Sequence, residues 1–188
     1  MEKLLKLCIM EKLLKLSLVL IVVIYCSATA VAKEWNGIVP LVSTKAEVEK
    51  LLGNGSPLDD KISEYHFEKS KVTVYYSQGP CTSVGDHAWN VPKNTVVYIV
   101  VSPIKKIFLH NLGVTLSEFS RSSGGADLPG TAFYLSTRIG MSMNVEERIS
   151  PDKHTVTLIH YFPSKDQLEL RCKNTVRPQI ARSHTEVV

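Results

Sequence analysis

The stretch T-V-V-Y-I-V-V, residues Thr95–Val101, decides the fold class of this chain. Six of its seven residues are β-branched and the seventh is Tyr98. Such side chains favour strands, and an unbroken run of them is typical of a strand buried on both faces. The stretch therefore predicts a central strand.

The residues before this strand predict a helix followed by a hairpin. Thr44 and Glu47 have the spacing of a capping box, and Gly53 stands where a helix begun at Thr44 would end. The runs Ile62–Phe67 and Val72–Tyr76 then alternate between apolar and polar residues across a four-residue gap, a pattern typical of a β-hairpin.

The residues after the central strand repeat this order. Thr115 and Glu118 have the same box spacing and predict a short helix ended by Gly124 and Gly125. Three further strands are expected, at Thr131–Thr137, Met141–Val145 and Thr155–Phe162.

The two halves also align with each other. At an offset of 60, Thr95, Val96, Ile99 and Pro103 match Thr155, Val156, Ile159 and Pro163, whereas the two capping boxes are offset by 71. One explanation is a tandem duplication with a longer loop in the first unit. The alternative is chance, because capping boxes are common and both strands are rich in β-branched residues.

The predicted fold is therefore α+β, with short helices packed on one face of an antiparallel sheet. The expected organisation is a signal segment at 1–32, a first helix-plus-sheet unit at 33–103, a second at 104–172 and a flexible tail at 173–188.

The N-terminal segment has the order of a secretory signal peptide. Lysines precede an apolar run from Leu18 to Tyr25, and small residues follow, so cleavage is expected between Ala32 and Lys33. We therefore expect an exported protein, periplasmic or extracellular. One alternative is an uncleaved membrane anchor over residues 13–32, although the apolar run is short for a bilayer span.

Two further alternatives concern the same segment. Cys26 would suggest a lipoprotein, but Tyr25 precedes it where a lipobox has a small residue. Residues 1–7 recur as residues 10–16, so Met10 is an alternative start to Met1.

Removing residues 1–32 leaves 156 residues, enough for one ordinary domain or two small ones. Of the 22 basic and 18 acidic side chains, 18 and 16 remain, a net charge of +2. No basic run interleaved with aromatic residues is present, so nucleic acid is not an expected partner.

Cys81 and Cys172 are the cysteines that remain after the signal segment. In an oxidising compartment two such cysteines predict a disulfide. Closing a loop of about 90 residues stabilises a fold by roughly 4 kcal/mol on the chain-entropy account. The alternative is two buried, unpaired thiols.

The sequence contains no constellation that we assign to a reaction. Cys81, Asp86 and His87 would suggest a thiol nucleophile with a base, but residues so close in one loop rarely hold that geometry. The six histidines lack metal-ligand spacing, and no phosphate-binding glycine motif is present. We therefore expect no enzyme activity, no metal and no cofactor, and we interpret His160 as a residue on a sheet face.

The loop from Gly79 to Asn94 is the candidate partner-binding surface. Trp89 is either packed onto the core or exposed as an anchor, and packing is the favoured interpretation. If exposed, Trp89 with His87 and Asn90 would form a partner-binding site.

The string S-T-K-A-E-V-E-K-L-L-G, Ser43–Gly53, followed by a hairpin rich in Tyr and Val, resembles the opening of modules in the SmpA/OmlA family of outer-membrane assembly lipoproteins, also called BamE. The same module in tandem is similar to the β-lactamase inhibitor protein. Those families act by binding proteins, so the resemblance implies a binding module. Trp35–Leu41, Tyr76–Cys81 and Trp89–Pro103 also resemble a group of bacterial exported proteins, which implies architecture without an activity.

The expected function is a non-catalytic protein-binding or cell-envelope assembly module, with another envelope or secreted protein as its partner. A membrane is expected to be contacted only by an uncleaved signal segment. The alternatives are an enzyme with a cleft between the two units and a structural envelope component. An exposed sheet face rich in aromatic residues would favour the binding module, and a cleft with a histidine and a carboxylate would favour the enzyme.

Overall fold

The computed structural model describes residues 32–82, 88–125, 128–148 and 150–172. The chain divides into two units, Met1–Ala30 and Val31–Val188, and every described residue belongs to the second. The signal segment up to residue 31, the loop residues Asp86 and His87, and the tail 173–188 therefore lie outside the described residues. At the expected cleavage point, Ala32 is buried and the Lys33 N–H donates to the Ile139 carbonyl at 2.7 Å.

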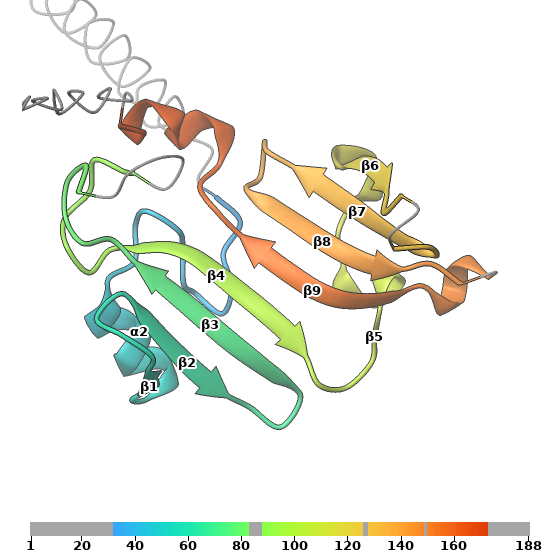
Figure 1. Cartoon of the computed structure of the whole chain (residues 1–188), viewed down its shortest axis with the longest axis horizontal. Helices are drawn as coiled ribbons and strands as arrows, with labels where there is room; N and C mark the ends of the chain where they lie inside the picture. The colour runs from blue at the N-terminus through green and yellow to red at the C-terminus, as the bar shows by residue number, and fades with distance from the viewer. Residues whose placement is uncertain (1–31, 83–87, 126–127, 149, 173–188) are drawn as a thin grey trace, which may run out of the picture. The chain divides into compact units, whose positions relative to one another are not determined.

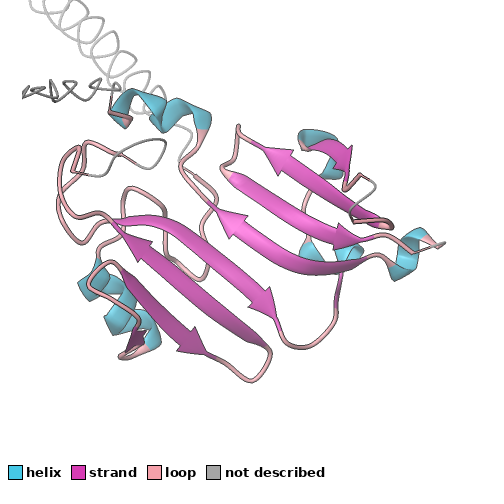
Figure 2. Ribbon diagram, viewed as in Figure 1, coloured by secondary structure: helices cyan, strands magenta, loops and turns pink. Residues whose placement is uncertain are grey.

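Strands make up more of the described residues than helices do (Figure 2). The first half contains α2 (Lys45–Leu52), β1 (Ser56–Pro57), β2 (Ile62–His66), β3 (Ser70–Tyr76) and β4 (Val96–Pro103). The second half contains β5 (Ile107–Phe108), β6 (Ser120–Ser123), β7 (Thr131–Ser136), β8 (Met141–Glu146) and β9 (Thr155–Tyr161). Short 3-10 helices are η1 (Leu109–Leu112), η2 (Leu116–Glu118), η3 (Pro151–Lys153) and η4 (Lys165–Leu170).

The described strands form one antiparallel sheet in the order β1-β2-β3-β4-β9-β8-β7-β6, with β5 paired to β9. The predicted antiparallel sheet is confirmed, but the fold is mostly β, with α2 as the α-helix of the described residues. β4 and β9 join the two halves into a continuous sheet. They lie side by side over a short stretch and then diverge (Figure 1).

The first helix and hairpin are as the sequence predicts. The Thr44 N–H donates to Glu47 Oε2 at 2.7 Å, and the Glu47 N–H donates to Thr44 Oγ1 at 3.4 Å, which completes the capping box. β2 and β3 pair with Tyr65 opposite Val72. The Val48 side chain of α2 is fully buried against this hairpin, so the helix covers one face of the first half.

The predicted second helix is wrong. Thr115 makes no side-chain capping bond, η2 is a single 3-10 turn, and residues 120–123 form strand β6 rather than the end of a helix. The spacing of a capping box does not by itself make a helix, because a turn also needs an apolar face to bury.

The core lies on one face of the sheet. Residues of the central strands point into it at a spacing of two, or of three where the register shifts on β4 and β9. In sequence order they are Val72, Val74, Tyr76, Val96, Ile99, Val101, Met141, Met143, Val145, Val156, Ile159 and Tyr161. The prediction that the central strand is buried on both faces is wrong in part, because Tyr98 and Val100 on β4 are only half-buried. The second face of the sheet is thus partly open to solvent.

Candidate functional site

The open face of the sheet carries the side chains that lie between the core positions. Cross-strand partners share a face, so the register places Ile62, Tyr75 and Tyr98 in one row across β2, β3 and β4. Tyr75 is 37% exposed. A ring this exposed at the middle of a sheet is available for contact with another molecule.

A second row on this face crosses the junction between the halves. Thr73 lies opposite Val100, Val100 opposite His160, and His160 opposite Ser142. Burial at this position lowers the pKa of His160 below its ordinary value. The imidazole is therefore a neutral, half-buried group at neutral pH, in line with its interpretation as a sheet-face residue.

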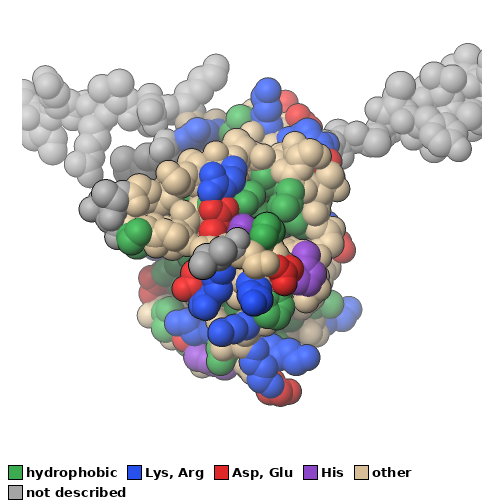
Figure 3. All heavy atoms as spheres, turned by 90° about the vertical axis from the view of Figure 1, so that its right-hand side faces the viewer, with side chains coloured by type: hydrophobic (Ala, Val, Ile, Leu, Met, Phe, Trp, Pro, Cys, Tyr) green, Lys and Arg blue, Asp and Glu red, His purple; other side chains and the backbone are tan. Residues whose placement is uncertain are grey.

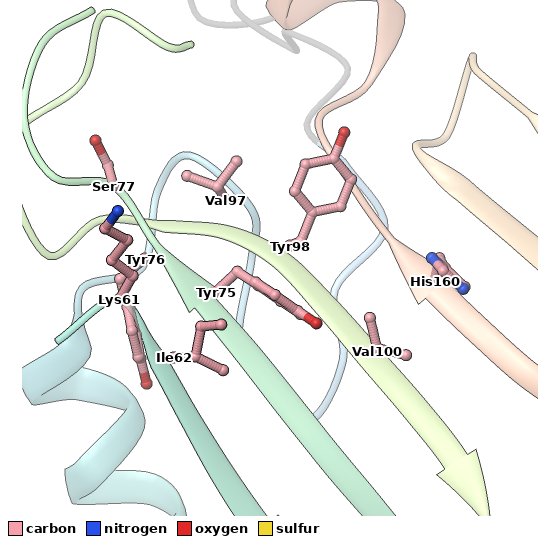
Figure 4. A pocket seen from close by; sticks show the side chains of 9 residues that line it. All are labelled: Lys61, Ile62, Tyr75, Tyr76, Ser77, Val97, Tyr98, Val100 and His160. Atoms are coloured by element: carbon pink, nitrogen blue, oxygen red, sulfur yellow. The ribbon is translucent and has the colours of Figure 1, made fainter. Parts of the chain in front are cut away.

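The two rows border a pocket of about 450 Å³ (Figure 4). Tyr75, Tyr98 and Val100 contribute side chains from β3 and β4, and His160 contributes one from β9. The remaining lining residues are Lys61, Ile62, Tyr76, Ser77 and Val97. No Asp or Glu is among these nine residues, so the pocket is mostly apolar with one cationic side chain.

The second half continues the open face. Phe133 on β7 is 38% exposed, and its cross-strand partner on β8 is Asn144, which lies opposite Leu158 on β9. On the side of the molecule that forms the right-hand side of Figure 1, hydrophobic side chains lie among Lys, Arg, Asp and Glu side chains (Figure 3).

The edge strand β6 is held by a charged network. Arg121 Nε donates to Glu147 Oε1 at 2.8 Å, and the Tyr134 hydroxyl donates to the same oxygen at 3.1 Å. The hydrogen bond from Arg121 lowers the pKa of Glu147. This ion pair lies at the β6 edge on the core side of the sheet, because Arg121 is the cross-strand partner of the buried Tyr134.

The predicted disulfide between Cys81 and Cys172 is confirmed, with the two Cα atoms 5.6 Å apart. The Cys81 N–H donates to the Trp89 carbonyl, and the Cys172 N–H donates to the Ala88 carbonyl, both at 3.0 Å. The disulfide therefore joins the loop that follows β3 to the segment that follows η4. A disulfide of this kind indicates an oxidising compartment.

Trp89 is packed rather than exposed. Its side chain is 4% exposed and belongs to a small apolar cluster with Leu41, Val91 and Val97. Asn90 is exposed, and its N–H donates to the Leu170 carbonyl at 2.7 Å. Trp89 and Asn90 therefore do not form one exposed surface, and His87 lies outside the described residues.

A pocket of about 460 Å³ in the second half contains the residue types expected of an enzyme cleft. Its lining includes His110, Asp152 and His154. His154 Nε2 lies 3.0 Å from the Arg148 carbonyl oxygen, and Asp152 accepts from the Ser150 hydroxyl. No hydrogen bond between Asp152 and either histidine is found in the described part of the chain. This pocket lies within the second half and not between the two halves.

Metal chemistry receives no support from the geometry of residues 32–82, 88–125, 128–148 and 150–172. Within these ranges no three His, Cys, Asp or Glu side chains lie close enough together to hold an ion. The same ranges contain no helix long and apolar enough to cross a membrane.

The sequence interpretation did not identify the 450 Å³ pocket. His160 is 60 positions from its partner Val100, and only the β4–β9 pairing brings them together. The available local signal was the alternation in Val72–Tyr76, which places Tyr75 on the face opposite the core valines.

Comparisons of the chain with protein-family models, with curated proteins and with solved structures found no match.

Proposed function

We propose that this chain is an exported, non-catalytic protein-binding module, and that it binds its partner through the open face of the sheet. The observation that carries the proposal is an aromatic row on this face, with Tyr75 37% exposed and Phe133 38% exposed in the other half. Tyrosine and phenylalanine at the centre of a partly exposed patch are typical anchors of protein interfaces. The resemblance to the SmpA/OmlA (BamE) family and to the β-lactamase inhibitor protein supports the same function.

The test is capture of partners from the cell envelope of the source organism by the exported protein. Tyr75→Ala and Phe133→Ala each remove an exposed ring from the open face. Leu51→Ala is the matched control, because Leu51 is 55% exposed but lies on α2. We expect a partner retained by the wild type and Leu51→Ala and weakened about tenfold by at least one of the other two variants. A partner bound equally by all four proteins would contradict the proposal.

The enzyme remains an alternative because one pocket holds His110, His154 and Asp152. An activity that is lost in both His110→Gln and His154→Gln, with folding intact, would favour it. A structural envelope component is the third alternative, and it predicts tight association with the envelope in the absence of a discrete partner.

We also infer that the two halves arose by tandem duplication. The support is the register of the junction: Ile99 pairs with Tyr161 and Val101 with Ile159, around the central pair of Val100 and His160. At the sequence offset of 60, Ile99 corresponds to Ile159 and Val101 corresponds to Tyr161. Exchanging the two strands therefore turns the pair Ile99–Tyr161 into the pair Val101–Ile159, and it leaves the central pair unchanged.

Two irregularities in the sheet support the same inference. The register shifts between Tyr75 and Tyr76 on β3, and it shifts between Asn144 and Val145 on β8. Both shifts occur at the same place relative to the partner strand, next to the pairs Tyr76–Val96 and Val145–Val156. The inference predicts that each relative of this chain shows the same internal correspondence, and relatives whose halves do not align in this way would contradict it.

A further inference from the structure

A third, smaller pocket of about 240 Å³ lies beside the disulfide-linked segments. Its lining combines aromatic and aliphatic walls with two cations, and includes Trp89, Tyr98, Phe162, Lys165, Leu168 and Arg171. Among the described residues, no Asp or Glu lines it. Tyr98 also lines the 450 Å³ pocket.

The walls of this pocket are fixed by backbone bonds. The Lys165 N–H donates to the Thr137 carbonyl at 2.7 Å, which ties the start of η4 to the end of β7. Trp89 and Arg171 form an isolated antiparallel bridge. The rings of Tyr98 and Phe162 are 6.5 Å apart at their centroids, a typical distance for an aromatic pair. The backbone positions of the two cationic residues, Lys165 and Arg171, are thus fixed by contacts with other segments.

The indole nitrogen of Trp89 gives an independent indication of a ligand. Trp89 is 96% buried, and no described residue accepts a hydrogen bond from its Nε1–H. Buried donors are nearly always paired, and an unpaired one is unfavourable. No described residue supplies that acceptor, and Trp89 is one of the residues that line this pocket with its two cations.

We propose that this pocket binds a small organic carboxylate with an apolar body. The carboxylate lies between Lys165 and Arg171, whose planar guanidinium matches its two oxygens. The apolar body packs on Tyr98, Phe162 and Leu168. Because Trp89 Nε1 is shielded from solvent, a hydrogen bond from this nitrogen to the carboxylate requires neighbouring side chains to move.

The size of the pocket restricts the ligand. Sites for drug-sized ligands measure roughly 300–1,000 Å³, and this one measures about 240 Å³. A single ring or a short branched chain is therefore the appropriate body. Two sources share this chemistry: a free organic acid and the C-terminal carboxylate of a peptide that ends in an apolar residue. This site shares Tyr98 with the protein-binding face proposed above, but the proposal does not depend on binding at that face.

The test uses the two tryptophans of the chain as internal probes. The full chain is expressed with ¹⁵N label and purified in its exported form, so that Trp89 and Trp35 each give an indole NMR signal. The probes are 3-phenylpropionate, its neutral amide and inorganic phosphate. A second arm uses acetyl-Gly-Phe with a free or an amidated C-terminus. Tighter binding of 3-phenylpropionate would identify a free organic acid as the source of the ligand, and tighter binding of the free-acid peptide would identify a peptide C-terminus.

We expect 3-phenylpropionate to shift the Trp89 indole signal saturably, leaving Trp35 unchanged, and we expect no shift from the amide or from phosphate. Lys165→Met is expected to weaken binding about tenfold, because it removes a charged donor. The matched control is Lys153→Met on η3, which is outside the pocket and should bind as the wild type does. An unmoved Trp89 signal, an equal shift with the amide, or unchanged binding by Lys165→Met would overturn the proposal.

Discussion

Val100 and His160 lie directly opposite each other in the short pairing of β4 with β9. This pair joins the two halves of the sheet and places an imidazole beside an apolar strand. Burial there lowers the pKa of His160 from its ordinary value of 6.5. We therefore expect the junction of the sheet to be sensitive to acid.

His160 is expected to make stability depend on pH below about 6.5. Above that pH the imidazole is neutral in both folded and unfolded chains and contributes nothing. Below it, the unfolded chain takes up the proton first, because the folded pKa is lower, and the free energy of unfolding falls. Urea unfolding between about pH 7 and about pH 5 should show this loss in the wild type and a smaller loss in His160→Gln.

His110→Gln is the control for that measurement, since it removes an exposed imidazole elsewhere. Working above pH 5 avoids Glu64 and Glu146, whose folded pKa values lie below 4.5 because of their hydrogen bonds to Lys71 and Arg148. Stability from these carboxylates is lost only at lower pH. Identical pH profiles for the wild type and His160→Gln would show that the junction is not the acid-sensitive element.

The two capping-box sequences should respond differently to substitution. Thr44→Ala removes a hydroxyl that accepts from the Glu47 N–H, and such caps contribute about 1 kcal/mol. Thr115→Ala removes a hydroxyl that makes no capping bond, so its effect should be within about 0.5 kcal/mol. Chemical denaturation of both variants makes the comparison, and equal losses would mean that both boxes are formed in solution.

Local patterns predicted the elements that depend on local chemistry. The hairpin Ile62–Tyr76 followed from alternation, and α2 followed from the bonds between Thr44 and Glu47. The predicted second helix failed because only the spacing of Thr115 and Glu118 was available, and spacing does not report whether a hydroxyl reaches a backbone N–H.

The candidate sites could not be predicted in the same way. The 450 Å³ pocket and the 240 Å³ pocket are both lined by Tyr98, whose neighbours come from other strands and from the segment after β9. The sequence did favour packing for Trp89, but it did not indicate the unpaired indole nitrogen, because that depends on which acceptors the fold brings near. Cys81 and Cys172 were predictable because an oxidising compartment leaves few alternatives for two cysteines.

Removing the disulfide should lower the thermal stability substantially. The two cysteines are 91 positions apart, and closing a loop of that length contributes about 4 kcal/mol on the chain-entropy account. For a domain of this size, that corresponds to a fall in Tm on the order of 10 °C. Calorimetry of the wild type, with and without reductant, and of the double variant Cys81→Ser/Cys172→Ser measures it. A double variant as stable as the oxidised wild type would show that the surrounding backbone bonds suffice.

Gly140, in the turn between β7 and β8, is expected not to tolerate substitution by alanine. Its φ is +68°, and a Cβ there would lie 2.1 Å from the Phe162 carbonyl oxygen, on the chain that leaves β9. The Phe162 N–H also donates to the Gly140 carbonyl at 2.9 Å, so the two segments cannot separate without losing this bond. Gly140→Ala should therefore lower the free energy of unfolding by about 3 kcal/mol or more.

Gly113 has a similar φ of +62° with no atom near its Cβ position, so Gly113→Ala should cost only about 1–2 kcal/mol from backbone strain. Equal losses of unfolding free energy in the two variants would mean that strain alone, and not the close approach of Phe162, requires glycine at position 140.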